Sequence, residues 1–347
     1  MIQSLQQTIR DAAARKQPLR LRGAGTKDFY GNTLRGEVLD TRGYAGIVAY
    51  EPTELVVTAR CGTALAELEG ALAQNRQILP FEPPHFGTGA TLGGCIAAGL
   101  AGPRRAAAGA LRDFLLGVKL IDGRGELLTF GGQVMKNVAG YDVSRVLAGS
   151  LGTLGFIAEA SLKLAPRPES ETTLSLEMPQ GRALEAINRW AGQPLPVTAS
   201  AWHDDTLMVR LSGSAQGVRA AAAKIGAEAM HDDPWTAIRE QRHEFFGGDE
   251  PLWRLALPSV SPPLALAGDT LIEWGGALRW LRSTAPAAEI RAAAAGAKGH
   301  ATLFRAADKS AGCFAALDPV SMRIHRELKA AFDPAGIFNP GRLYAEL

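Results

Sequence analysis

Three glycine-rich segments contain the residues of this sequence most suited to binding a ligand. The first, RGAGTK at residues 22–27, directly follows a short strand pattern. Its glycines let successive main-chain N–H groups converge on an anion, while Thr26 and Lys27 add a hydroxyl and a positive charge. The pattern fits a phosphate or pyrophosphate, or else an ordinary tight surface turn. Asp28 takes the place of the third glycine of G-x-G-x-x-G and no helix pattern follows, which disfavours a Rossmann turn.

Two more glycine-rich segments follow along the chain. Residues 83–105 carry six glycines, at positions 87, 89, 93, 94, 99 and 102. This backbone either lies flat against a planar or anionic ligand or lets helices pack closely. The third segment joins GYD at 140–142 to the turn GSLGTLG at 149–155. Three such loops exceed the needs of local turns, and together they indicate one shared ligand.

No local spacing in the sequence is typical of a metal centre. The six histidines are scattered, and the three cysteines, Cys61, Cys95 and Cys313, form no Cys-x-x-Cys pair. Closely spaced ligands are the usual sequence signature of a metal site. We therefore predict no bound metal, and the isolated cysteines indicate a reducing compartment. The His-Asp-Asp runs at 203–205 and 231–233 are typical of polar turns.

One cluster in the second half of the chain combines aromatic and charged residues. It consists of Trp253, Arg254, Glu273, Trp274, Arg279 and Trp280. Arginines near aromatic rings can hold a small anion such as a carboxylate. The alternative is a set of core tryptophans flanked by surface charges, and the sequence leaves both interpretations open.

Hydrophobic periodicity predicts the elements that must position these residues. An amphipathic helix over 2–17 ends at Pro18, and a second helix spans 64–75. Apolar runs predict strands at 19–22, 47–50, 55–60, 78–81, 116–121, 126–130 and 156–164. Pro166 and Pro168 mark a boundary. Beyond it, a small α+β unit is indicated by further patterns, among them a helix over 218–230 and a strand pair at 270–273 and 278–282.

Length and charge limit the classes of function. A chain of 347 residues is long enough for about two domains. With 37 basic and 35 acidic residues the net charge is +2, which gives no electrostatic reason to expect nucleic-acid binding. No run approaches the ~20 apolar residues of a membrane span. We expect a cytoplasmic protein that meets a membrane, at its inner face, only through a partner.

Six segments of the sequence resemble the flavoproteins of the vanillyl-alcohol oxidase / p-cresol methylhydroxylase (PCMH) type. They run in family order and cover nearly the whole chain. The segments are RGAGTK at 22–27, YEPTELVVTARCGTALAELE at 50–69, LPFEPPHFGTGATLGGCIAAGLAGPRR at 79–105, RDFLLGVKLIDGRGELL at 112–128, KNVAGYDVSRVLAGSLGTLGFIAEASLKLAP at 136–166 and FDPAGIFNPGR at 332–342. Within this family the chain most resembles the FAD-binding subunits of bacterial glycolate oxidase, also called glycolate dehydrogenase.

The resemblance implies an α+β fold in which two subdomains hold FAD and an α+β cap covers its ring. Residues 1–168 would form the FAD-binding domain, 169–300 the cap, and 301–347 a C-terminal segment that returns to the first domain. The residues implied in FAD binding are Arg22, Gly23, Ala24, Gly25, Thr26, Lys27, Thr91, Gly93, Gly94, Gly140, Tyr141, Asp142, Gly152, Thr153, Gly155, Ile157 and Asn339. Because covalent relatives carry His where this chain has Thr26, we expect non-covalent FAD.

The resemblance also implies a function. It indicates a subunit of a complex that oxidises glycolate to glyoxylate, with a larger catalytic flavoprotein subunit and an iron–sulfur subunit that passes electrons toward a quinone. Candidate groups near the ring or the substrate carboxylate are Lys136, Tyr141, Arg254 and Arg279. The metal-binding histidine pair of hydroxy-acid dehydrogenating relatives is absent. Two alternatives stay open: a self-sufficient FAD-dependent oxidase or dehydrogenase of another small hydroxy acid or alcohol, and a non-catalytic scaffold that contains FAD.

Overall fold

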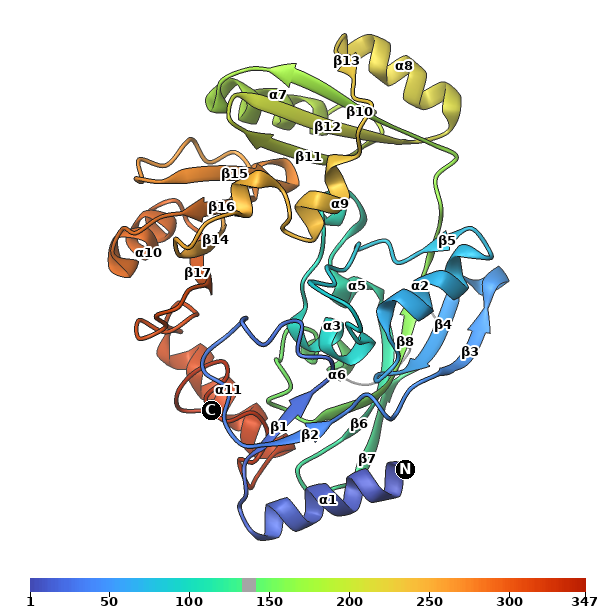
Figure 1. The fold of residues 1–347 in the computed structure, drawn as a ribbon, viewed down its shortest axis with the longest axis vertical. Helices are drawn as coiled ribbons and strands as arrows, with labels where there is room; N and C mark the ends of the chain where they lie inside the picture. Colours follow the sequence, from blue (N-terminus) through green and yellow to red (C-terminus); the bar gives the residue numbers. More distant parts are fainter. Residues whose placement is uncertain (133–141) are drawn as a thin grey trace.

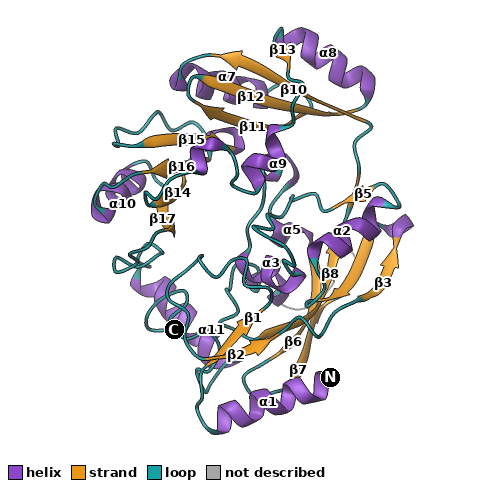
Figure 2. Cartoon of the chain, viewed as in Figure 1, coloured by secondary structure: helices purple, strands orange, loops and turns teal. Residues whose placement is uncertain are grey.

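The computed structural model describes residues 1–132 and 142–347, and its strands form two main sheets (Figure 1). The five-stranded sheet has the order β3-β4-β8-β6-β7, and the eight-stranded sheet the order β13-β10-β12-β11-β15-β16-β14-β17. Neighbouring strands are antiparallel in both sheets. Helices are interspersed with strands along the chain (Figure 2), which confirms the α+β fold class.

The five-stranded sheet, the pairs β1–β2 and β5–β9, and their helices come from the first half of the chain. The elements are α1 (Ile2–Ala14), β1 (Leu19–Arg22), β2 (Glu37–Asp40), β3 (Ile47–Glu51), η1 (Pro52–Glu54), β4 (Val56–Arg60), α2 (Leu65–Ala73), β5 (Gln77–Ile78), α3 (Leu92–Ala98), α4 (Arg105–Ala108), α5 (Leu111–Phe114), β6 (Leu115–Ile121), β7 (Leu127–Gly131), α6 (Val143–Val146), β8 (Phe156–Lys163) and β9 (Ala165–Pro166).

Strand β8 lies at the centre of this half and is buried on both faces. Leu65, Leu68 and Leu72 of α2, spaced at three and four residues, pack with one face of the sheet. On the other face, Ile9 of α1 packs against Phe156. The apolar run from 156 to 164 therefore reads as a continuous buried strand rather than an alternating one.

The C-terminal tail packs back against the first strand. Helix α11 (Pro319–Phe332) begins at Asp318, whose carboxylate accepts the free N–H groups of the first turn. Beyond it, Phe338 pairs in parallel with Leu19 of β1, and the Asn339 N–H donates to the Leu19 carbonyl at 2.9 Å. The tail thereby extends the β1–β2 pair.

The eight-stranded sheet and its helices come from the second half. The elements are β10 (Ser170–Glu177), α7 (Gln180–Ala191), β11 (Val197–His203), β12 (Thr206–Gly213), α8 (Ala215–Ile225), β13 (Glu228–Ala229), α9 (Pro234–Arg239), η2 (Glu244–Phe246), β14 (Leu252–Ala256), β15 (Asp269–Glu273), η3 (Trp274–Gly276), β16 (Leu278–Arg282), α10 (Ala287–Gly296) and β17 (His300–Arg305). In the described part of the chain, no helix has the length and apolar character needed to cross a membrane.

Two sequence expectations differ from this half of the structure. The helix predicted over 218–230 ends at Ile225, because Gly226 adopts the left-handed conformation (φ +72°) and the next residues pair with β10 as β13. The sheet also continues past residue 300, since β17 pairs with β14 up to Arg305. The predicted strand pair at 270–273 and 278–282 is confirmed as β15 and β16.

The two halves meet through an aromatic cluster and an ion-pair network. The cluster combines Tyr30 and Leu100 of the first half with Trp274 and Trp280 of the second. The Trp274 Nε1–H donates to the carbonyl of Gly102 at 3.0 Å. Beside it, an ion-pair network links Glu82 and Arg104 to Glu171 and Arg210. These contacts fix how the eight-stranded sheet faces the glycine-rich loops.

Candidate functional site

Two adjoining cavities lie over the first glycine-rich loop, and we call them together the glycine cleft. Their walls combine β1 and its following loop, the start of α3, the turn at 151–157 and the C-terminal tail. The predicted residues that line them are Arg22, Gly23, Ala24, Gly25, Thr26, Lys27, Thr91, Gly93, Gly94, Gly152, Gly155, Ile157 and Asn339. The fold therefore brings all three glycine-rich segments, distant in sequence, to one place.

Two other predicted cofactor residues, Thr153 and Asp142, do not line these cavities. Thr153 is buried beneath the turn, where its hydroxyl donates to the Ser150 carbonyl at 2.8 Å and its own carbonyl accepts from Lys329. Asp142 forms an ion pair with Arg145 at 2.8 Å. Gly140, Tyr141 and Lys136 lie outside the described residues.

Close approach explains why two positions of the cleft are glycine. A Cβ atom on Gly23 would collide with the Thr91 hydroxyl, so side chains larger than hydrogen would separate β1 from the start of α3. Gly152 has a φ of +70°, and a Cβ there would lie 2.7 Å from Nδ2 of Asn339. Both contacts are between segments far apart in sequence, so the glycines hold the walls of the cleft together.

Lys27 gives the glycine cleft an uncompensated positive charge. Its ammonium donates to the His85 carbonyl at 3.2 Å and forms no ion pair among the described residues. Burial lowers its pKa, with Cys95 and Glu240 acting in the opposite direction. By contrast, Arg22 is neutralised by Asp28 at 2.8 Å. A glycine-lined cleft that contains this unpaired cation fits an anionic dinucleotide such as FAD.

The side chain of Asn339 holds two walls of the cleft in place. Its Oδ1 accepts the N–H of Leu21 at 2.9 Å, and its Nδ2 donates to the carbonyl of Leu151 at 2.7 Å. Arg342, which sequence reasoning missed, donates to the carbonyls of Asp28 and Asn32. Burial lowers the pKa of Arg342 to about 10. Its position in FNPGR, one of the segments that resemble the flavoprotein family, could have identified Arg342 from the sequence.

Sequence reasoning missed most of the apolar and small residues that line the cleft. Most of these side chains are not typical ligand-binding groups, and only the fold assigns them to the walls. The missed residues, besides Arg342, are Leu21, Asp28, Leu34, Thr41, Cys61, Ala97, Ala98, Leu151 and Phe156.

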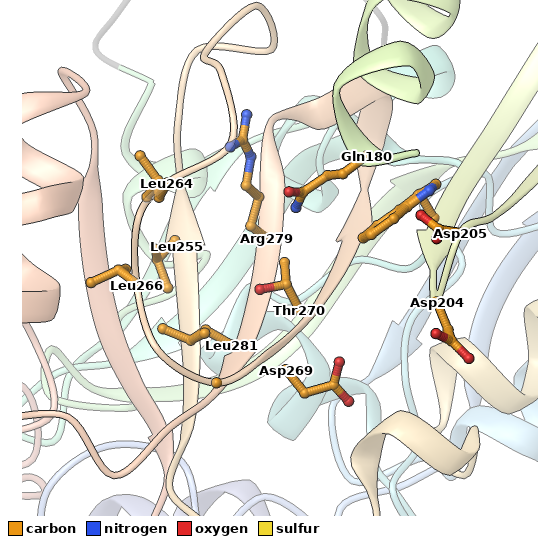
Figure 3. Close-up of a pocket in the computed structure, with 12 residues that line it drawn as sticks. Gln180, Asp204, Asp205, Leu255, Leu264, Leu266, Asp269, Thr270, Arg279 and Leu281 are labelled. Atoms are coloured by element: carbon orange, nitrogen blue, oxygen red, sulfur yellow. The ribbon is translucent and has the colours of Figure 1, made fainter. Parts of the chain in front are cut away.

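The two arginines expected near the substrate lie on opposite faces of the eight-stranded sheet. Arg254 is paired across the strands with Trp280, so it shares the face that packs against the first half. Arg279 precedes Trp280 and points the other way, into a pocket with Thr270 and Gln180 (Figure 3). It is 2 % exposed, and its guanidinium donates to the carbonyls of residues 261, 262 and 276. Main-chain carbonyls already satisfy the Arg279 guanidinium, so the structure gives no support to its expected place near the substrate, which stays a prediction.

A buried carboxyl group lies near Arg254 on the face toward the first half. Glu273, at the end of β15, accepts a hydrogen bond from Nε1 of Trp280 at 2.7 Å. Burial raises the pKa of Glu273 to about 7, while the Trp280 bond and Arg254 oppose this rise. Near neutral pH the group can thus hold or release a proton.

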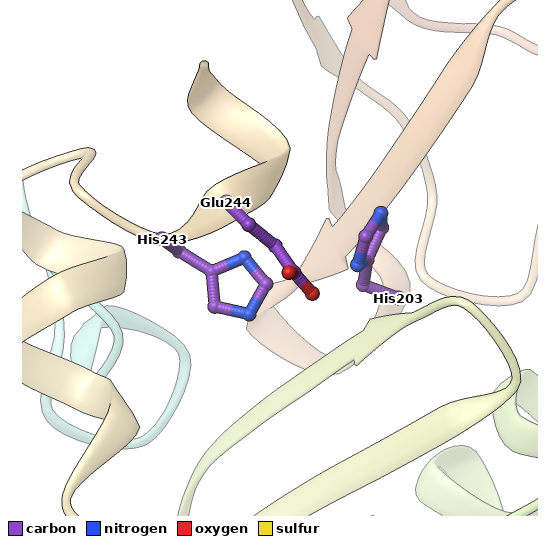
Figure 4. Close-up of side chains that lie close together, drawn as sticks. All are labelled: His203, His243 and Glu244. Atoms are coloured by element: carbon purple, nitrogen blue, oxygen red, sulfur yellow. The ribbon is translucent and has the colours of Figure 1, made fainter.

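Three side chains form a compact cluster at the edge of β11 (Figure 4). Ligand atoms of His203, His243 and Glu244 lie within 4.8 Å of one another. His203 Nε2 is 3.2 Å from the Asp269 carboxylate, and the N–H of Phe245 donates to His243 Nδ1 at 3.3 Å. Each imidazole thus already uses one nitrogen. The histidines are far apart in sequence, so local spacing could not reveal the cluster, and absence of bound metal stays a prediction.

Family profiles match both ends of the chain. The profile described as "FAD binding domain" matches residues 2–131. The profile described as "FAD linked oxidases, C-terminal domain" matches residues 308–343. The first match contains the loop at 22–27 and the start of α3, and the second contains Asn339 and Arg342, so both include walls of the glycine cleft.

Individual proteins give the same assignment. The chain is 48% identical to "Glycolate oxidase subunit GlcE" of Escherichia coli K12 over 345 residues, which cover 99% of this chain and 98% of that protein. It is 33% identical to "Glycolate oxidase subunit GlcD" of Bacillus subtilis 168 over 159 residues, covering 45% of this chain and 34% of that protein.

Among solved structures, an alkyldihydroxyacetonephosphate synthase shares the fold. The TM-score is 0.66 at 15% identity, with 97% of this chain and 75% of that chain covered. Since that identity is low, this likeness concerns the fold alone. The end-to-end identity with GlcE goes further, and it agrees with an anion-binding cleft built from three glycine-rich segments. The chain is therefore an FAD-dependent oxidoreductase of the PCMH-type FAD-linked oxidases, and belongs with the FAD-binding glycolate oxidase subunits.

Proposed function

We propose that this chain binds FAD in the glycine cleft and takes part in the oxidation of glycolate to glyoxylate as one subunit of a complex. The observation that carries this proposal is the 48% identity to a glycolate oxidase subunit along the whole chain. The structure supports it through the convergence of the three glycine-rich segments on one cleft. Bound FAD supplies the acceptor for the hydride that leaves the α-carbon of the substrate.

Particular parts of the cleft suit particular parts of FAD. The loop at 22–27 is our candidate for the first pyrophosphate contact, since it has glycine N–H groups and the unpaired Lys27 ammonium. Thr91, Gly93 and Gly94 at the start of α3 are the second. The segment from Gly152 to Ile157 and the tail at Asn339 would line the flavin and the adenosine ribose. Lys136, Tyr141 and Gly140 remain candidates from the sequence alone.

Partners complete the proposed reaction. We expect a larger catalytic flavoprotein subunit and an iron–sulfur subunit, through which electrons leave toward a quinone. A glycolate oxidase subunit named GlcD resembles part of this chain, which supports an assembly of related flavoproteins. The complex would be cytoplasmic, and the chain would reach the inner face of the membrane only through its partners.

Two measurements test this proposal. The purified chain should be yellow and release FAD on acid treatment, and a colourless chain that cannot be reconstituted with FAD would contradict it. The chain should then be mixed anaerobically with glycolate, alone and within the complex. Flavin bleaching that needs the complex supports a subunit role. Bleaching of the isolated chain indicates a self-sufficient enzyme, and no bleaching of its flavin in either case indicates a scaffold.

A further inference from the structure

Arg105 and Arg254 both lie over the ring of Trp274 at the junction of the two halves. Its guanidinium carbon lies 4.4 Å from the ring centroid of Trp274, and that of Arg254 lies 5.2 Å from the same centroid. Arg105 comes from α4 of the first half, whereas Arg254 comes from β14 of the second. Two cations from different parts of the fold therefore share one aromatic platform.

Neither of these guanidinium groups forms an ion pair with a described residue, although the buried Glu273 lies near Arg254 and Asp113 near Arg105. Within the described residues, Arg105 and Arg254 make no side-chain hydrogen bond and no ion pair, although each is partly buried. The neighbouring Arg104 differs sharply, because it binds Glu82 at 3.2 Å and Glu171 at 2.5 Å. Burial lowers the pKa of Arg105, and repulsion from Arg254 adds to the effect. An anion between the two groups would relieve this repulsion.

The aromatic cluster that contains Trp274, on whose ring both arginines pack, adjoins the glycine cleft. Ala98 of α3 lines the cleft and also belongs to the aromatic cluster that contains Trp274. Tyr30 of the same cluster comes three residues after Lys27 in the loop that begins the cleft. The Trp274 indole is tied to Gly102, just before Arg105. A small ligand held by the arginines would therefore sit between the cleft and the sheet.

We propose that Arg105 and Arg254 together bind the carboxylate of a small hydroxy acid, with the Trp274 ring holding both guanidinium groups in place. The proposal rests on the proposed function for the identity of the anion, and it adds a binding group that sequence reasoning did not single out. Guanidinium groups suit this task because they offer paired N–H donors to the two carboxylate oxygens. Because the two arginines come from different halves, the site would form only when the halves are correctly assembled.

Calorimetric titration of the FAD-loaded chain with oxalate, a dicarboxylate without a hydroxyl to oxidise, tests the proposal. Arg105→Gln and Arg254→Gln should each weaken oxalate binding by about 10-fold or more, because each removes charge-assisted hydrogen bonds. Arg105→Lys and Arg254→Lys keep the charge but lose the paired donors, and should recover only part of the affinity. Arg219→Gln is the matched control, since this exposed arginine of α8 has no interaction with either arginine of the site.

The outcomes separate this inference from the proposed function. Wild-type affinity in both glutamine variants, at unchanged FAD content, would overturn the arginine site. Equal weakening by Arg219→Gln would also overturn it, because general electrostatics would then explain the effect. If oxalate fails to bind the FAD-loaded wild-type chain while the complex still oxidises glycolate, the arginine site fails and the proposed function stands. If the chain takes up no FAD, the proposed function fails first.

Discussion

At the level of single residues, Lys27 and Arg22 belong to one loop but differ in how their charges are compensated. Arg22 shares the single carboxylate of Asp28 with Arg20, so its charge is partly compensated inside the protein. Lys27 is left with a carbonyl partner, and burial lowers its pKa. A cation that is costly to bury without an anion is well placed to gain from a phosphate.

Lys27→Gln should therefore weaken FAD binding by about 10-fold or more, since it removes a charge-assisted contact. Stability of the FAD-free chain should stay the same or rise, because an unpaired ammonium is no longer buried. FAD titration with protein fluorescence as the signal measures the affinity. Lys224→Gln, at an exposed position of α8, is the control and should change neither quantity. Unaltered affinity in Lys27→Gln would remove this residue from the phosphate site.

Thr26 predicts how FAD is attached. A threonine hydroxyl in the loop offers no nucleophile comparable to the histidine of covalent relatives, and RGAGTKDFYG contains no cysteine. Acid precipitation of the loaded protein should give a colourless pellet and a yellow supernatant. A pellet that retains its flavin absorbance after washing would show a covalent link.

Glu273 should make stability depend on pH. Its pKa is about 7 in the folded chain, raised by burial from an ordinary value of 4.5. Between these values the folded chain holds a proton that the unfolded chain has released, so its contribution is fully present below about pH 4.5 and is lost as pH rises through 7. The loss is on the order of 3 kcal/mol. Denaturant unfolding at pH 5 and pH 8 should show a smaller difference in Glu273→Gln than in the wild type, and equal differences would contradict this role.

At the level of elements, the glycine cleft depends on how closely β1, α3 and the 151–157 turn approach one another. Gly23 lets β1 contact Thr91, the N-cap residue whose hydroxyl accepts from Gly94 N–H at 3.2 Å. A Cβ atom on Gly93 would lie 3.0 Å from the Cβ and the carbonyl oxygen of Cys61, so a side chain there would displace the start of α3. The same small residues thus serve both packing and ligand access.

Gly23→Ala should reduce FAD occupancy by about 10-fold while the eight-stranded sheet stays folded, because the added methyl group collides with Thr91. Gly152→Val should act more strongly, since φ is +70° and Asn339 is in the way. Gly70→Ala in α2 is the matched control: nothing lies within 4 Å of its Cβ position, and helix propensity predicts a gain of up to about 1 kcal/mol. Flavin content and circular dichroism measure the two properties. Normal flavin content in Gly23→Ala and Gly152→Val would show that these glycines serve only as turns.

The glycine cleft could be predicted from the sequence because a backbone with positive φ or very close contacts requires glycine, and glycines are visible in the sequence. The face to which a strand side chain points was harder to predict. Arg254 and Arg279 look alike in sequence, but Arg254 pairs with Trp280 and points toward the first half. Arg279 is adjacent to Trp280 in β16, so it points to the opposite face, where carbonyls bind it. The sequence could not distinguish Arg105 from its neighbour Arg104, because the ion pairs that occupy Arg104 exist only in the folded chain. Convergence of His203 and His243 was invisible for the same reason.

At the level of the whole molecule, the network of Glu82, Arg104, Glu171 and Arg210 connects the two halves. Glu82 accepts from both arginines, with Arg210 at 2.8 Å, and all three side chains are largely buried. Removing one member of a buried ion-pair network leaves its partners uncompensated.

Glu82→Gln should lower the free energy of unfolding by about 3 kcal/mol and allow the halves to unfold separately. Scanning calorimetry should show one transition in the wild type and a broader or split transition in the variant. Glu185→Gln removes an exposed carboxylate that lies 3.9 Å from Arg182, and should change stability by less than about 0.5 kcal/mol. A single, unshifted transition in Glu82→Gln would show that the network does not couple the halves.

The contact between β1 and the tail has a consequence for biosynthesis. Leu19 and Leu21 leave the ribosome about 300 residues before their partners Phe338 and Asn339. Because Asn339 and Arg342 complete the walls around the loop at 22–27, a growing chain cannot form the finished cleft. Insertion of the cofactor must therefore follow synthesis of the tail, and the loop at 22–27 lacks these contacts while the whole eight-stranded sheet is being synthesised.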